Sequence, residues 1–126
     1  MQLNVSAITD DSEDLFGKTV SDLQQDISVG RTGITGTLKY VDDYTGFSGD
    51  PSLQSGNYLA LHCEVPDASD VSITVTVTNP SVLDPDGDIV LRIADKDTQT
   101  VTVVAVADGQ TLRKTFSLRG LTVLDS

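Results

Sequence analysis

His62 and Cys63 are the only histidine and the only cysteine of the chain, and they are neighbours. A thiolate beside an imidazole base is a pair that nucleophilic catalysis uses. The segment 57–65, NYLALHCEV, alternates apolar residues and is predicted to be a strand, in which neighbouring side chains project from opposite faces. The face of Cys63 carries Leu59, Leu61 and Val65, and the face of His62 carries Tyr58 and Glu64. We therefore interpret Cys63 as a small core residue and His62 as an outward-facing residue, and with no second His or Cys we expect no zinc site.

Alternating aspartates offer a second kind of chemistry in the segment 83–95, LDPDGDIVLRIAD. Asp84, Asp86 and Asp88 have the spacing of calcium-binding carboxylates, and Asp95 would be the twelfth residue of a loop that starts at Asp84. The glycine, however, is at the fourth position rather than the sixth, and the twelfth residue is not glutamate. Calcium at these three aspartates is a candidate, whereas an ordinary turn at the entry to a strand is the interpretation we favour.

A long connection at 42–56, DDYTGFSGDPSLQSG, carries two aromatic residues between glycines. Tyr44 and Phe47 could form a contact surface for a carbohydrate or a protein, because long loops with aromatic residues often do so. The alternative, which we favour, is that both rings fold back over the end of the core, since large rings rarely stay exposed.

Most of the chain alternates apolar and polar residues with period two, which predicts strands. These strands would position the residues described above. The clearest case is 71–78, VSITVTVT, in which four apolar residues alternate with Ser and Thr. Further strands are predicted at 34–41, 57–65, 88–94, 100–107 and 111–118, with a short last one at 121–124. Asp108-Gly109 is a dipeptide typical of a tight hairpin and predicts one between the strands at 100–107 and 111–118.

One short helix is predicted within 17–28, where Ser21 and Gln24 have capping-box spacing and Val20, Leu23 and Ile27 share a face. Residues 1–16 are expected to be a flexible or edge-strand arm with a solvated acidic run at 10–14, and residues 17–126 a single domain. Seven to eight short strands separated by turns are typical of an all-β, immunoglobulin-like sandwich. A small β-barrel is the alternative.

The 126 residues carry a net charge of −11, from nineteen acidic and eight basic residues. Such a charge repels phosphate backbones and anionic membranes, so we expect no nucleic-acid or membrane partner. It favours solubility, and it would also suit docking onto a basic surface. No apolar stretch is long enough to span a membrane, and the first sixteen residues lack the basic and apolar regions of a signal peptide. We expect a protein that is either cytoplasmic or delivered to its site by an assembly process that needs no signal peptide.

Four segments carry a family resemblance: 17–27, GKTVSDLQQDI; 34–61, ITGTLKYVDDYTGFSGDPSLQSGNYLAL; 92–109, RIADKDTQTVTVVAVADG; and 116–123, FSLRGLTV. In their strings and order they resemble small virion proteins of tailed bacteriophages and prophages. The resemblance implies a head-associated structural role, as a capsid decoration or head-fibre component with an immunoglobulin-like domain. It implies assembly in the bacterial cytoplasm, with the capsid protein or other virion subunits as partners and self-association left open.

Three functions follow from these observations. The first is a non-enzymatic virion structural protein. The second is an immunoglobulin-like module that binds carbohydrate or protein through the 42–56 loop. The third is an enzyme that uses paired carboxylates, which we do not expect, because no such site is visible although the chain is rich in aspartate.

Overall fold

The computed structural model describes residues 8–27, 32–44, 56–78, 82–83 and 88–123. The strands are β1 (Ile8–Asp14), β2 (Thr35–Tyr44), β3 (Gly56–Glu64), β4 (Val71–Val77), β5 (Val82–Leu83), β6 (Ile89–Arg92), β7 (Thr100–Ala107) and β8 (Gln110–Ser117). One α-helix, α1 (Val20–Asp26), and one 3₁₀ helix (Ile93–Thr98) complete the elements. The fold is therefore mainly β, as the period-two alternation predicts.

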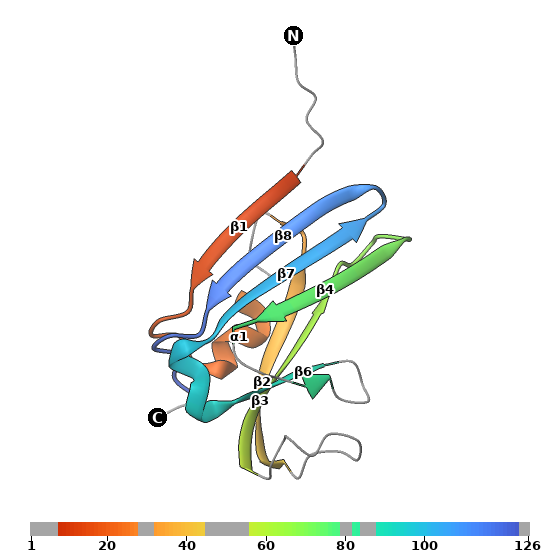
Figure 1. Ribbon diagram of the computed structural model, residues 1–126. Coiled ribbons are helices and arrows are strands. Elements are labelled where there is room, and N and C mark those ends of the chain that lie inside the picture. The colour runs from red at the N-terminus through yellow and green to blue at the C-terminus, as the bar shows by residue number, and fades with distance from the viewer. Residues whose placement is uncertain (1–7, 28–31, 45–55, 79–81, 84–87, 124–126) are drawn as a thin grey trace.

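The strands form two four-stranded sheets with the orders β1-β8-β7-β4 and β2-β3-β6-β5. Figure 1 shows the first sheet in front, with α1, β2, β3 and β6 behind and below it. All described pairings are antiparallel except β1 with β8, which is parallel. Each strand belongs to one sheet only, which is the arrangement of a sandwich rather than of the barrel that was the alternative.

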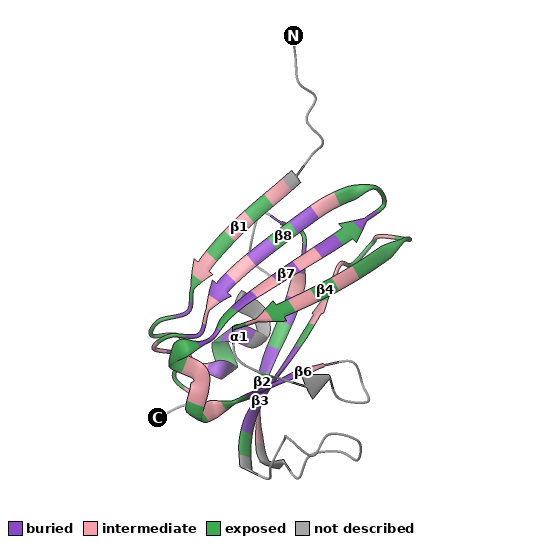
Figure 2. Cartoon of the chain, viewed as in Figure 1, coloured by how far each residue is buried: buried purple, intermediate pink, exposed green. Residues whose placement is uncertain are grey.

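One core lies between the sheets and α1. Leu38, Leu59 and Leu91 come from one sheet, and Val103 and Phe116 come from the other. Leu38, Val103 and Phe116 alternate with exposed or half-exposed neighbours, whereas the neighbours of Leu59 in β3 are also buried, as the burial colours along the strands show in Figure 2. Burial of one face of each sheet is what converts the period-two pattern into a sandwich.

The hairpin between β7 and β8 has the predicted tight turn. Asp108 and Gly109 have φ values of 50° and 87°, the left-handed conformation that this turn requires at both positions. The carboxylate of Asp108 also accepts hydrogen bonds from the backbone N–H groups of Ser69 (3.2 Å) and Asp70 (2.9 Å). The turn therefore fastens the loop before β4 to the hairpin.

Helix α1 forms where it was predicted, but with a different cap. Thr19 Oγ1 accepts from the N–H of Asp22 at 3.2 Å, and Asp22 Oδ2 accepts from the N–H of Thr19 at 3.1 Å. This reciprocal pair makes the expected capping box of Ser21 and Gln24 wrong, because the helix begins two residues earlier than that box requires. The apolar face is confirmed: Val20, Leu23 and Ile27 are all buried.

The structure refines or corrects three other expectations. The acidic run at 10–14 lies within the edge strand β1, where Asp10, Ser12 and Asp14 are exposed and Asp11 and Glu13 are half-buried. Residues 121–123 form no strand beyond a single bridge between Thr19 and Thr122. Tyr58, expected to point outward with His62 and Glu64, is 3% exposed and therefore buried.

Candidate functional site

The first sheet carries a concentration of charge at the junction of β1 and β8. Their parallel register places Asp10 opposite Arg113 and Asp11 opposite Lys114. Because successive side chains of a strand point to opposite faces, this register sorts the charges into an outer pair and an inner pair.

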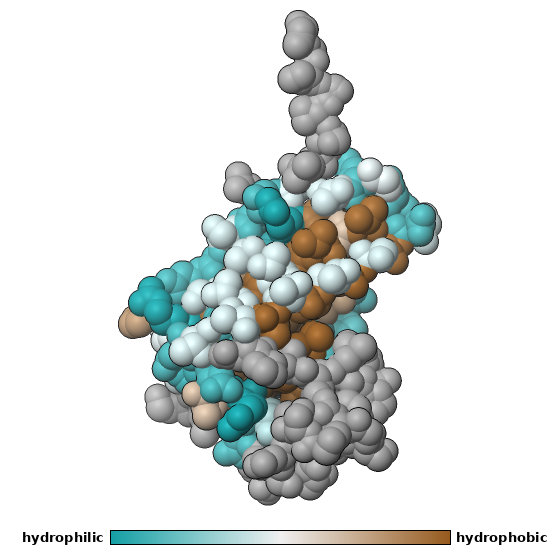
Figure 3. Space-filling model, viewed as in Figure 1, coloured by the Kyte–Doolittle hydropathy of each residue, from teal (hydrophilic) through white to brown (hydrophobic). Residues whose placement is uncertain are grey.

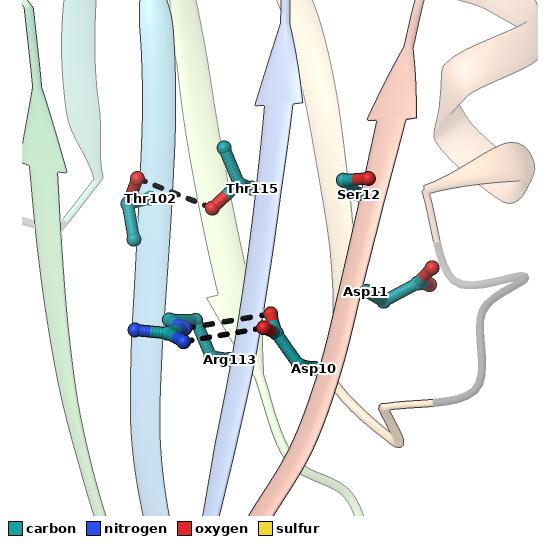
Figure 4. Close-up of a pocket in the computed structure, with 6 residues that line it drawn as sticks. All are labelled: Asp10, Asp11, Ser12, Thr102, Arg113 and Thr115. Atoms are coloured by element: carbon teal, nitrogen blue, oxygen red, sulfur yellow. Dashed lines mark hydrogen bonds and ion pairs between the residues drawn. The ribbon is translucent and has the colours of Figure 1, made fainter.

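On the outer face, Arg113 holds Asp10 with two hydrogen bonds. The Nε–Oδ1 distance is 3.4 Å and the Nη2–Oδ2 distance is 3.1 Å. Beside them the hydroxyl groups of Thr102 and Thr115 are 3.3 Å apart and share a hydrogen bond. Both pairs are drawn in Figure 4. They line an open, polar depression of about 510 Å³, together with Asp11 and Ser12.

On the inner face, Lys114 is 1% exposed and lies among core residues. Its Nζ is 3.3 Å from Asp11 Oδ2 and 3.1 Å from Glu13 Oε1. The two carboxylates retain some contact with water, with 17% and 22% of their side chains exposed. They compensate the charge of the ammonium, which could not be buried unpaired without a large loss of stability.

A third ion pair, between Arg119 and Asp14, lies where β1 ends. Arg119 Nη2 donates to Asp14 Oδ2 at 2.7 Å, and the guanidinium lies 5.4 Å from the centre of the Phe16 ring. The hydrogen bond from Arg119, with a second from the Phe16 N–H, lowers the pKa of Asp14. The Gly120 N–H and then Lys96 likewise lower the pKa of Asp97. These acids therefore stay ionised and serve to hold the chain segments together.

The two acids that line the depression each have a basic partner, Arg113 for Asp10 and Lys114 for Asp11. Hydrolysis by two carboxylates needs both in one cleft at about 5–10 Å. Asp10 points toward Arg113 in Figure 4, whereas the neighbouring Asp11 points away from it. Arg113 and Asp10 are mutually paired, and Thr102 is bonded to Thr115. The polar groups that line the depression thus support the sheet.

The interpretation of His62 and Cys63 is confirmed. His62 is about half exposed, and its Nδ1 lies 2.9 Å from Asp88 Oδ1, a bond that requires the proton on Nδ1 because a carboxylate only accepts. Cys63 is partly buried against the core, and burial raises the pKa of its thiol to about 12. A thiol that keeps its proton at neutral pH is a poor nucleophile.

The calcium candidate lies largely outside the described residues, since these include Asp88 but not Asp84 or Asp86. Asp88 is bonded to His62. β6 then extends the chain over Ile89–Arg92, so Asp95 lies beyond a strand and interacts with Arg92 at 3.8 Å. Within the described ranges no group of three or more His, Cys, Asp or Glu residues could hold a metal ion.

The aromatic candidates of the 42–56 loop also fall outside what the structure describes. Phe47 lies in an undescribed segment, and the side chain of Tyr44 is not described although its backbone ends β2. The interpretation of these two rings therefore stays a prediction.

Sequence reasoning missed the charges at the β1–β8 junction. Lys114 has the same period-two register as Leu112 and Phe116, which are buried, and that position is the signal that could have identified it. Its partners Asp11 and Glu13 also alternate. Nothing local indicates that these two segments, a hundred residues apart, form neighbouring parallel strands.

Comparison of the chain with protein-family models, with curated proteins and with solved structures found no match. Among the helices that the structure describes, none has the length and apolar character needed to cross a membrane.

Proposed function

We propose that the protein is a non-enzymatic structural subunit of a tailed-bacteriophage or prophage virion, attached to the head as a decoration or head-fibre component. The segments at 17–27, 34–61, 92–109 and 116–123, which resemble such proteins, support the virion role. The proposed partner is the capsid protein or another virion subunit.

We assign the sandwich to the immunoglobulin-like type on its strand order. In that type, strands A, B, E and D form one sheet and C, F and G the other. The order β2-β3-β6-β5 corresponds to A-B-E-D, and β4, β7 and β8 correspond to C, F and G. β1 is then an additional strand beside the last one.

The observation that carries the structural role is the outer face of the first sheet. Its charged side chains are paired with one another at Asp10–Arg113 and Asp14–Arg119. The strip over β7 and β4 is instead made of Thr, Ser and Val residues, and Val106 is 46% exposed. A broad sheet face with an uncharged strip beside a strip of paired charges suits packing against another protein surface.

Co-sedimentation with shells assembled from the capsid protein of the same phage or prophage tests the proposal. We expect the chain to pellet with shells and to remain in the supernatant without them. Val106→Asp should reduce the bound fraction, because it places a charge on the uncharged strip and replaces an exposed apolar side chain. Glu64→Gln, an exposed change on the other sheet, is the matched control and should bind normally.

Failure of the unaltered chain to bind shells would overturn the decoration role. A glycan-binding screen of Tyr44→Ala and Phe47→Ala would then test the carbohydrate-binding alternative.

A further inference from the structure

β4 lies at the edge of the first sheet without the features that usually protect an edge. Among the strands described, it pairs with β7 alone. Its sequence, VSITVTV, has no charged residue and no proline, two of the features by which natural edge strands are protected from pairing. The opposite edge, β1, carries Asp10, Asp11, Glu13 and Asp14. One edge is thus protected by charge and the other is not.

The side chains around β4 are also incompletely covered. Val71 is 37% exposed, and Ile73, Val75 and Val77 on the same face are only partly buried. Figure 3 shows apolar residues gathered toward the β7–β4 side of the sheet and hydrophilic ones toward β1. Among the described residues no strand lies beside the free edge of β4, and its inward aliphatic side chains are only partly buried.

The residue types of β4 are nearly symmetric about Thr74. An antiparallel pair of two β4 strands centred there would place Thr74 opposite Thr74, Ser72 opposite Thr76 and Ile73 opposite Val75. Val71 would lie opposite Val77. Hydroxyl groups would meet hydroxyl groups on the outer face and aliphatic groups would meet on the inner face, which are favourable cross-strand pairs.

The charges of the chain permit this pairing although the net charge is −11. β4 itself is neutral, and the acidic cluster of β1 lies three strands away in the same sheet. Asp70, the residue before β4, would lie opposite Thr78 and not opposite its own copy. Within 70–78 this pairing therefore places no acidic side chain directly opposite another one, which limits like-charge repulsion.

We infer that two copies of the chain associate through β4. The two β4 strands pair in antiparallel fashion about Thr74 and join the first sheet of each copy into one continuous sheet. The contact uses the same strand in both copies, so it is a closed two-fold dimer. This inference does not depend on the virion role, because it follows from β4 alone.

Disulfide cross-linking in the full-length protein tests both the surface and the register. Thr74→Cys should form a 74–74 disulfide in oxidised glutathione, since directly opposed residues lie about 4.5–5.5 Å apart at Cα, within disulfide reach. Ser72→Cys should not cross-link with itself, but should cross-link when mixed with Thr76→Cys. Ser12→Cys, at an exposed position of β1, is the matched control and should form no disulfide between copies.

Sedimentation equilibrium of the unaltered chain gives an independent readout. We expect a mass that rises with concentration to twice the chain mass and no further. Thr74→Lys should restore the monomer over the same range, while Ser12→Lys should leave the dimer intact. A monomer at all concentrations, growth beyond the dimer, or equal cross-linking at positions 12, 72 and 74 would overturn the inference.

Discussion

Lys114 Nζ lies 3.1 Å from Glu13 Oε1, and Lys114 is almost fully buried. The two residues are a hundred positions apart in the sequence, and they meet because β1 pairs in parallel with β8. Together with Asp11 they form an ion cluster at the margin of the core. This cluster ties the N-terminal strand to the C-terminal one, so we expect its removal to weaken the sheet at that edge.

Removal of both acids should destabilise the protein more than removal of the base. The double variant Asp11→Asn, Glu13→Gln leaves a buried ammonium without a counter-charge, for which we expect a loss of about 3 kcal/mol in the free energy of unfolding. Lys114→Met keeps the apolar stem and removes the charge, so we expect a loss of about 1 kcal/mol or less.

Urea unfolding at pH 7 measures both values. Asp10→Asn is the control, because its pair with Arg113 is exposed and should contribute less than about 1 kcal/mol. Equal losses in the double variant and in Asp10→Asn would contradict the structural role of Lys114.

Asp108 should be required for its carboxylate as well as for its turn conformation. Asp108→Ala removes the acceptor of the Ser69 and Asp70 N–H groups and places alanine at φ 50°. We expect a loss of about 2 kcal/mol by thermal or urea unfolding. Asp108→Asn keeps both an acceptor and the tolerance for this φ, so it should recover most of the stability. Equal stability of the alanine and asparagine variants would show that these hydrogen bonds do not contribute to the free energy of unfolding.

Gly120 and Gly109 provide a matched pair of glycines with positive φ, at 75° and 87°. A Cβ at Gly109 would meet open space, whereas a Cβ at Gly120 would overlap the Phe16 ring. We expect Gly109→Ala to cost about 1 kcal/mol from backbone strain, and Gly120→Ala to cost about 1 kcal/mol more.

The excess at Gly120 should disappear in a Phe16→Ala background, which a double-mutant cycle measures. Persistence of the excess without the ring would show that its cause is not the contact with Phe16.

Cys63 should be unreactive in the folded protein. Because burial raises the pKa of its thiol from 9.0 to about 12, iodoacetamide at pH 8 should modify it far more slowly in the native protein than in urea. Between pH 9 and pH 12 the native state keeps a proton that the unfolded state has lost, so this group makes stability fall as pH rises through that window. Cys63→Ala should reduce that alkaline slope. Equal alkylation rates in the native and unfolded chains would contradict the burial.

The alternation of residues decided much of the secondary structure before any tertiary contact was considered. VSITVTVT at 71–78 and Asp108-Gly109 specify a strand and a hairpin through local rules of pleat and φ, and both elements are present. The burial of Cys63 follows from the same rule, because the face of a side chain in a strand depends only on its position.

The tertiary structure alone decided the features that join distant segments. The parallel β1–β8 pair, the burial of Lys114 and the bond between His62 and Asp88 depend on which strands become neighbours. An acidic run such as DDSED can be solvated or paired, and only a basic strand beside it decides which. The local pattern determines which face of a strand a residue occupies. Which strand lies beside it is determined by packing over the whole chain, because local conformational preferences do not select a neighbouring strand.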